Sequence, residues 1–207
     1  MKRDTAVHAL LACALAIASL AARAASPVPV AAEHGMVVTA QHLATHVGVD
    51  VLKDGGNAID AAVAVGYALA VVYPAAGNLG GGGFMTLQLA NGRKSFLDFR
   101  EKAPLAASAD MYLDAAGNVI PGASTRGQLA VGVPGTVAGL ELARTKYGTM
   151  TRAALIAPAI ALARDGYVLS RADADILDGK RFAKDPVAVK IFLRPDGTRF
   201  EPGDRIV

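Results

Sequence analysis

The segment from Ala58 to Val72 is apolar on nearly every side, and it limits the folds open to this chain more than any other stretch. Its sequence, AIDAAVAVGYALAVV, holds one charged residue, Asp60. Asn57 is a favourable N-cap residue and Asp60, three positions later, is the acid of a capping box, so the pattern predicts a helix. A helix that is hydrophobic all round must be covered on all sides. We therefore expect a layered fold around it.

The first 24 residues have the pattern of a secretory signal peptide. Two basic residues precede the apolar run ALLACALAIASLAA, and Ala22-Arg23-Ala24 has the small-x-small form of a signal-peptidase site. We predict cleavage before Ala25 and a periplasmic or secreted location. A lipoprotein signal around Cys13 is the alternative, but the apolar stretch before that cysteine is short.

The composition of the mature chain narrows the function classes. The whole chain has a formal net charge of +3, whereas residues 25–207 hold 18 basic and 17 acidic residues, so we expect no nucleic-acid partner. The only cysteine lies in the signal, which leaves no disulfide to form. The longest apolar run is interrupted by Asp60 and ends at Pro74, short of the ~20 residues of a membrane span, so we expect no membrane partner.

The rest of the chain mixes helical and strand patterns, which favours an α/β or α+β layered fold. Residues 25–34 are rich in Ala, Pro and Val and are expected to form a flexible lead-in. The predicted elements are a strand at 34–40, helices at 41–54 and 58–72, a hairpin with strands near 85–89 and 95–99, helices at 134–147 and 151–165, and a second hairpin turning at 196–197. We expect the helix at 151–165 to be kinked or restarted at Pro158.

Four consecutive glycines, Gly80 to Gly83, lie between two apolar segments in NLGGGGFM. Glycine-rich loops bind phosphate where they lead from a strand into a helix, but these glycines follow a helix and lead into a strand. No Gly-Lys-Ser/Thr follows them. The pattern therefore favours close backbone packing or a strained turn over nucleotide binding.

The histidines and the possible nucleophiles of the mature chain do not form a complete catalytic or metal site. His42 and His46 have the spacing of two zinc ligands, but a zincin needs Glu after the first His, where this chain has Leu43, and no clear third ligand exists. There is no Gly-x-Ser-x-Gly elbow and no cysteine nucleophile in the mature chain. We expect neither a metal nor a cofactor.

The stretch LDFREKAP, residues 97–104, places Asp98, Arg100 and Glu101 at the end of a predicted strand. An arginine there can present its planar fork to the carboxylate of a substrate. It can equally pair with Asp98 or Glu101 and hold the loop. The residue types alone favour the structural pair and leave the substrate anchor open.

Several ordered blocks resemble the N-terminal part of a bacterial gamma-glutamyltransferase (gamma-glutamyltranspeptidase) precursor. They are GMVVTAQHLATHVGVDVLKDGGNAIDAAVAVGYALAVVYPAAGNLGGGGFM, LDFREKAP, DMYLDAAGN, GVPGTVAGL, KYGTM and PAIALARDGY. The similarity runs in one register over residues 35–207. It implies the α+β fold of an N-terminal nucleophile hydrolase, an αββα sandwich that is incomplete in this chain. Residues 35–207 would then be the N-terminal portion of the large subunit, truncated.

The resemblance also implies a function. In that family an exported zymogen cuts itself into two subunits, and the threonine exposed at the new N-terminus attacks gamma-glutamyl amides such as glutathione. The acyl-enzyme passes the glutamyl group to water, amino acids or peptides. The Thr-Thr-His stretch that begins the small subunit is absent here, and Thr149 and Thr151 match an interior block. We expect no catalytic residue in this chain, no activity of the fragment alone, and the missing C-terminal half as its partner.

One substrate contact can be carried over from the family. Arg100, in DFRE, matches the arginine that binds the α-carboxylate of the gamma-glutamyl group, so the resemblance favours a substrate-binding Arg100. The glycine run is then expected to position the strand pair that presents Arg100 and to bind no ligand. Two other readings remain: a related acylase acting on glutaryl-type amides, and a non-catalytic exported partner protein.

Overall fold

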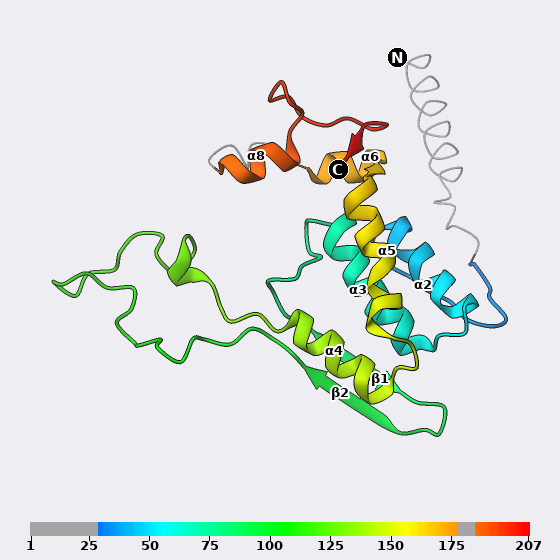
Figure 1. Ribbon diagram of the computed structural model, residues 1–207. Helices are drawn as coiled ribbons and strands as arrows, with labels where there is room; N and C mark the ends of the chain where they lie inside the picture. Colours follow the sequence, from blue (N-terminus) through cyan, green and yellow to red (C-terminus); the bar gives the residue numbers. More distant parts are fainter. Residues whose placement is uncertain (1–28, 178–184) are drawn as a thin grey trace, which may run out of the picture. The chain divides into compact units, whose positions relative to one another are not determined.

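A computed structural model describes residues 29–177 and 185–207, so the predicted signal peptide lies outside the described residues. Residues 35–207 form one unit (Figure 1). Its elements are α2 (His42–Lys53), α3 (Ala58–Val72), β1 (Phe84–Gln88), β2 (Lys94–Asp98), η1 (Gln128–Ala130), α4 (Thr136–Tyr147), α5 (Arg152–Asp165), β3 (Tyr167–Val168), α6 (Arg171–Ile176), α8 (Pro186–Phe192) and β4 (Arg205–Ile206). None of the described helices is both long and apolar enough to cross a membrane.

Helix α3 is covered by three other helices, as its apolar sequence predicts. It packs against α2, α4 and α5 (Figure 1), and eight of its fifteen residues are buried. The predicted capping box is confirmed: the side chain of Asn57 accepts from the backbone N–H groups of Ile59 and Asp60, and the Asp60 carboxylate accepts from the N–H of Asn57. Burial of a valine such as Val63, which is 1% exposed, contributes roughly 1.5–3 kcal/mol.

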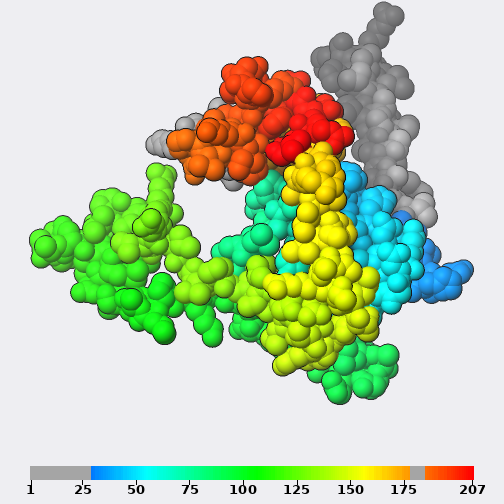
Figure 2. Space-filling view, in the orientation of Figure 1, coloured from blue at the N-terminus to red at the C-terminus, as the bar shows by residue number. Residues whose placement is uncertain are grey.

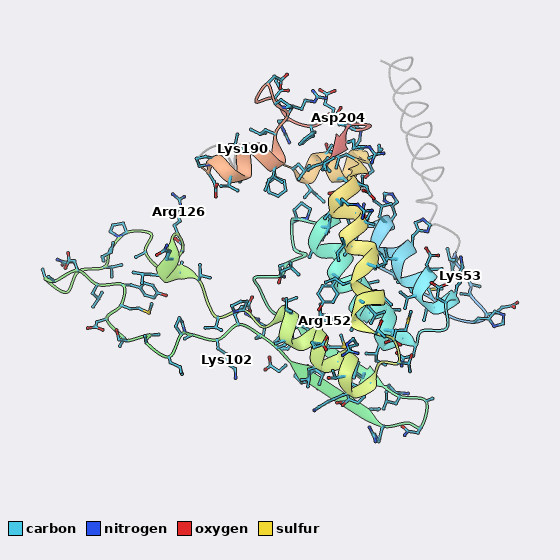
Figure 3. All side chains as sticks on the ribbon, in the orientation of Figure 1. Lys53, Lys102, Arg126, Arg152, Lys190 and Asp204 are labelled. Carbon is cyan, nitrogen blue, oxygen red and sulfur yellow. The ribbon has the colours of Figure 1, made fainter. Side chains whose placement is uncertain are left out.

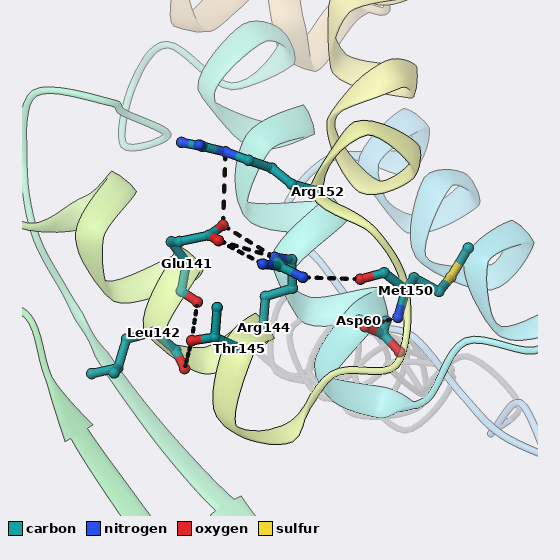
Figure 4. A network of polar contacts seen from close by, with 7 residues as sticks. All are labelled: Asp60, Glu141, Leu142, Arg144, Thr145, Met150 and Arg152. Carbon is teal, nitrogen blue, oxygen red and sulfur yellow. Dashed lines mark hydrogen bonds and ion pairs between the residues drawn. The ribbon is translucent and has the colours of Figure 1, made fainter.

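A charged network joins α4 to α5 and to the loop between them (Figure 4). Arg144 donates through Nη2 to Glu141 on the preceding turn of α4 at 2.6 Å, and through Nη1 to the carbonyl of Met150 at 3.3 Å. Arg152, at the start of α5, forms an ion pair with the same Glu141 at 3.7 Å. Glu141 thus connects two of the three helices that cover α3.

The predicted hairpin is present, and the described residues cover only one of its faces. Strands β1 and β2 are antiparallel, with Phe84 opposite Asp98, and Gly92 in the turn has a φ of 81°. Leu87 and Leu97 are buried in the core cluster that also contains residues of α3, α4 and α5. Phe84 and Phe96 lie on the other face, stacked at 5.6 Å between ring centroids, and more than half of each is exposed.

The predicted strand at 34–40 was wrong. Residues 35–40 have no strand assignment, because no described segment pairs with them. The side chain of Val37 instead packs against α2, where Gly48 leaves room for it. In this stretch, an apolar side chain thus packs against a helix and not within a sheet.

Two later predictions need correction. Helix α5 runs through Pro158 without a break, so of the predicted kink or restart the restart is absent. The turn at 196–197 forms, with Gly197 at a φ of 81°, but its flanks make only an isolated bridge between Leu193 and Arg199. The residues before Leu193 belong to α8, so they are not available as a strand.

The described residues form an α+β arrangement with two separate two-stranded antiparallel sheets, β1-β2 and β3-β4. These elements do not confirm the predicted αββα sandwich. The long connection between β2 and α4 adds no layer, because residues 103–133 have no buried side chain; they are drawn in green in Figure 2.

Candidate functional site

Arg100 lies two residues beyond the end of β2, and its neighbours hold it through three contacts. Its backbone N–H donates to Oδ1 of Asp98 at 3.0 Å, and its Nε donates to Oε2 of Glu101 at 3.0 Å. The guanidinium carbon lies 5.6 Å from the centroid of the Phe84 ring. The structural pair that the sequence left open is therefore real and involves Glu101, while Asp98 bonds only the backbone.

The pair with Glu101 involves only the Nε atom of the Arg100 guanidinium. Within the part of the chain that the structure describes, no polar group bonds the two terminal nitrogens of Arg100, and 61% of its side chain is exposed. Hydrogen bonds from the backbone of Glu101 itself and from the Arg100 side chain hold the pKa of the Glu101 carboxyl below its usual value. Glu101 is thus ionised at neutral pH and fixes one edge of the guanidinium, which leaves the opposite edge for a ligand.

The glycine run packs against the backbone that carries Arg100. A Cβ on Gly82 would lie 2.6 Å from the carbonyl oxygen of Phe99 and 2.8 Å from Cα of Arg100. Gly83 continues the strand pairing, because its carbonyl accepts from the N–H of Phe99 at 3.0 Å. The predicted close backbone packing is confirmed at Gly82, where any side chain would force the two segments apart.

A hollow of about 240 Å³ lies beside Arg100. One wall comes from the end of β2 and the residues after it, including Asp98 and Lys102. The other comes from the residues that lead into α4 and from its first two turns, including Pro134 and Leu142. Lys102 exchanges two backbone hydrogen bonds with Val133, at 3.2 and 2.8 Å, which closes the base of the long connection. Figure 3 labels Lys102 at this point of the chain.

The other residues singled out from the sequence have structural contacts. His42 and His46 pack edge to face at 6.5 Å, and the described residues contain no cluster of three or more possible metal ligands. The hydroxyl of Thr149 donates to Asp60 at 2.7 Å, and Thr151 caps α5 by accepting from the N–H of Ala154.

Sequence reasoning missed Asn78 and Thr136, whose side chains meet at 2.6 Å although 58 residues separate them. The only local signal was their position beside glycine-rich stretches, NLGGGG and GVPGT. Neither stretch indicates by itself that the two would meet.

The profile of the gamma-glutamyltranspeptidase family matches residues 44–207, which is most of the chain. The chain belongs to the gamma-glutamyltranspeptidase family. The glutathione hydrolase proenzyme of Pseudomonas sp. (strain A14) is 66% identical over all of this chain and 36% of its own length. This gamma-glutamyltranspeptidase chain therefore spans about a third of the length of the curated relatives it matches, in their N-terminal part.

Solved structures agree with the family assignment. The gamma-glutamyltranspeptidase of Helicobacter pylori is 50% identical with a TM-score of 0.80, over 87% of this chain and 52% of that one. A cephalosporin acylase from Bacillus halodurans is 29% identical with a TM-score of 0.70, over 89% of this chain and 36% of that one. The family predicted from the sequence is confirmed. The chain is also similar in structure to an acylase.

Proposed function

We propose that this chain is the N-terminal segment of a gamma-glutamyltranspeptidase that cleaves gamma-glutamyl amides such as glutathione. The glutamyl group would pass to water, amino acids or peptides through a threonine acyl-enzyme, with the nucleophile supplied by polypeptide outside residues 1–207. The observation that carries this proposal is the guanidinium of Arg100, whose Nε is held by Glu101 while its terminal nitrogens have no partner in the described part of the chain.

The free edge of Arg100 suits the α-carboxylate of a gamma-glutamyl group. Two parallel N–H groups on a planar fork can donate to both oxygens of one carboxylate, which fixes orientation as well as position. Holding the carboxylate would place the γ-amide at a fixed distance, where a threonine activated by its own α-amine can attack.

The proposal extends to architecture and location. The exposed hairpin face with Phe84 and Phe96 would pack against a second sheet, as the inner faces of a sandwich do, and so complete an αββα fold. Residues 1–24 would direct export to the periplasm or medium. N-terminal sequencing of the exported protein should begin at Ala25, and a mature protein that begins at Met1 contradicts the export proposal.

The test of Arg100 uses the complete enzyme, meaning the full polypeptide that carries this chain. It can be expressed from its own gene or made with residues 1–207 replacing the matching part of the Pseudomonas sp. relative. Arg100→Ala should raise KM for gamma-glutamyl substrates about 10- to 100-fold, because a charge-assisted hydrogen bond is lost. Arg100→Lys should recover only part of this, because an ammonium lacks the fork.

The controls separate binding from folding. Self-cleavage should survive in Arg100→Ala, since the arginine contacts the substrate and not the cleavage site. Arg126→Ala removes an exposed arginine from the long connection (Figure 3) and should leave KM unchanged. An unchanged KM in Arg100→Ala would remove Arg100 from the substrate site.

The likeness to a cephalosporin acylase supports a second candidate, an acylase for glutaryl-type amides. A glutaryl group keeps the carboxylate that Arg100 would bind and lacks the α-amino group. Comparing kcat/KM for matched gamma-glutamyl and glutaryl amides therefore distinguishes the two activities. A complete polypeptide that cleaves neither supports the third reading, a non-catalytic partner protein.

A further inference from the structure

We propose that Asn78 and Thr136 are positioning residues for Arg100. Their side-chain contact fastens the glycine run to the start of α4, and these two segments together hold the backbone that presents the arginine. This inference rests on the proposed substrate-binding function of Arg100. It assigns a role to two residues that do not themselves reach the guanidinium.

The contact is a compact set of hydrogen bonds around Asn78. Its Oδ1 accepts from the hydroxyl of Thr136 at 2.6 Å and from the N–H of Gly81 at 2.9 Å, and its Nδ2 donates to the carbonyl of Ala76 at 3.0 Å. The side chain of Asn78 thus bonds the chain before it, the chain after it and α4. Thr136 is only 7% exposed, so its hydroxyl has little access to water as an alternative partner.

The backbone adds a second connection between the same two segments. The carbonyl of Gly81 accepts from the N–H groups of Gly135 and Thr136, at 2.8 and 3.0 Å. The N-cap of α4, Gly135, has no side-chain cap, so Gly81 supplies the acceptor for the first N–H groups of this helix. The backbone of Gly81 thus takes the backbone N–H of Thr136, while the hydroxyl of Thr136 donates to Asn78.

The glycine run and the start of α4 both pack directly against residues 99–101, and glycines form these contacts. A Cβ on Gly82 would lie 2.7 Å from the backbone nitrogen of Glu101, and a Cβ on Gly135 would overlap the carbonyl of Phe99. A Cβ on Gly139, one turn into α4, would overlap the Phe99 ring. A shift of the glycine run relative to α4 must therefore move residues 99–101.

Loosening this contact should weaken substrate binding more than chemistry. The guanidinium must meet both carboxylate oxygens at once, and bidentate geometry tolerates little displacement. The side-chain hydrogen bonds of Asn78 and Thr136 join segments of this chain, whereas the proposed nucleophile comes from polypeptide outside it. We expect KM to rise while kcat is nearly unchanged, the pattern of lost uniform binding.

The experiment is a double-mutant cycle in the complete enzyme, with a gamma-glutamyl amide as substrate. Thr136→Val keeps the shape and removes the hydroxyl, and should raise KM about tenfold because Oδ1 of Asn78 loses a buried donor. Thr136→Ser keeps the hydroxyl and should restore KM to within about twofold of the parent. In an Arg100→Ala background, Thr136→Val should raise KM no further, because it acts through the arginine.

The outcomes distinguish the proposed function of Arg100 from the positioning role of Asn78 and Thr136. If Arg100→Ala alone leaves KM unchanged, the proposed function fails and this inference fails with it. If Arg100→Ala raises KM but Thr136→Val does not, or raises it equally in both backgrounds, the positioning role is overturned and the function of Arg100 stands. Asn78→Ala repeats the cycle if Thr136→Val does not mature. Should neither variant mature, the contact is needed for folding, and the positioning role is likewise overturned.

Discussion

Asp60 is fully buried in an apolar helix, and hydrogen bonds from the start of its own helix and from one distant loop stabilise its charge. It accepts from the N–H of Asn57 at 3.0 Å, from the N–H and hydroxyl of Thr149, and from the N–H of Met150 at 3.2 Å. Burial by itself raises the pKa of the Asp60 carboxyl. The hydrogen bonds from Thr149, Asn57 and Met150 together have the larger effect and bring the pKa below its usual value. One carboxylate thus fixes both the start of α3 and the loop before α5 (Figure 4).

Asp60→Asn should loosen that loop, because an amide replaces one of the two acceptor oxygens with a donor NH2 group and removes the charge. The loss should be about 2–3 kcal/mol, the cost of leaving buried groups unpaired. Hydrogen exchange of the complete enzyme measures it locally, as faster exchange of the amides of Thr149 and Met150. Thr149→Val removes one donor only and should have a smaller effect. Unchanged protection in Asp60→Asn would contradict the role of the carboxylate.

The same carboxylate should make the loop acid-sensitive. Because the folded pKa of Asp60 is lowered, its contribution is fully present above the unfolded value of about 3.9 and is lost as the pH falls through the folded value. Protection factors at Thr149 and Met150, corrected for intrinsic exchange, should therefore decline below about pH 4. In Asp60→Asn this decline should be absent, and its persistence would point to another group.

At the scale of elements, the approach of the glycine run to the segment after β2 depends on missing side chains at particular positions. A Cβ on Gly82 would lie within 2.8 Å of three backbone atoms of residues 99–101, whereas a Cβ on Gly80 would meet nothing within 4 Å. Neither glycine has a positive φ, so the difference between them is one of packing and not of backbone strain.

These two glycines form a matched pair for a test. Gly82→Ala should destabilise by about 1–3 kcal/mol, as overpacking against backbone does, and should lower the yield of mature enzyme. Gly80→Ala should stay within about 0.5 kcal/mol of the parent, as exposed substitutions usually do. Urea midpoints of the two variants give the comparison. Equal midpoints would show that the run serves as a flexible linker and not as a packed element.

For residues 35–207 as a whole, the helices bury one another while large apolar side chains elsewhere remain open. Phe84 and Phe96 are 55% and 59% exposed on one hairpin face, and Leu105 is fully exposed on the long connection. Apolar patches of this kind mark surfaces that bind other protein. The family match to relatives about three times as long is consistent with such a use.

Residues 25–207 prepared alone should therefore bind a hydrophobic dye and associate. The double variant Phe84→Thr and Phe96→Thr should bind less dye, because it removes the stacked rings and keeps β-forming residues on the strands. Dye fluorescence and sedimentation measure both effects. A monomeric preparation that binds no dye would contradict this view of the hairpin face.

The sequence alone determined features that depend on neighbouring residues. Asn57 and Asp60 predicted the start of α3, the strand patterns near 85–89 and 95–99 predicted the hairpin, and the ordered blocks predicted the family. Caps and tight turns are encoded within a few residues, because the groups they pair are close along the chain. The resemblance likewise made Arg100 the candidate substrate contact, which stays a prediction.

Tertiary structure decided which distant segments meet. The stretch at 34–40 has strand composition but pairs with no strand among the described residues. A strand forms only beside a second strand, and its own sequence does not specify which segment that is. The contact of Asn78 with Thr136 spans 58 residues, and that of Asp60 with Thr149 spans 89. Residues so far apart in the sequence leave no short-range pattern that predicts their contact. These pairs form only when the helices pack together. The setting of Arg100, with one edge held and the other free, therefore became visible only in the folded chain.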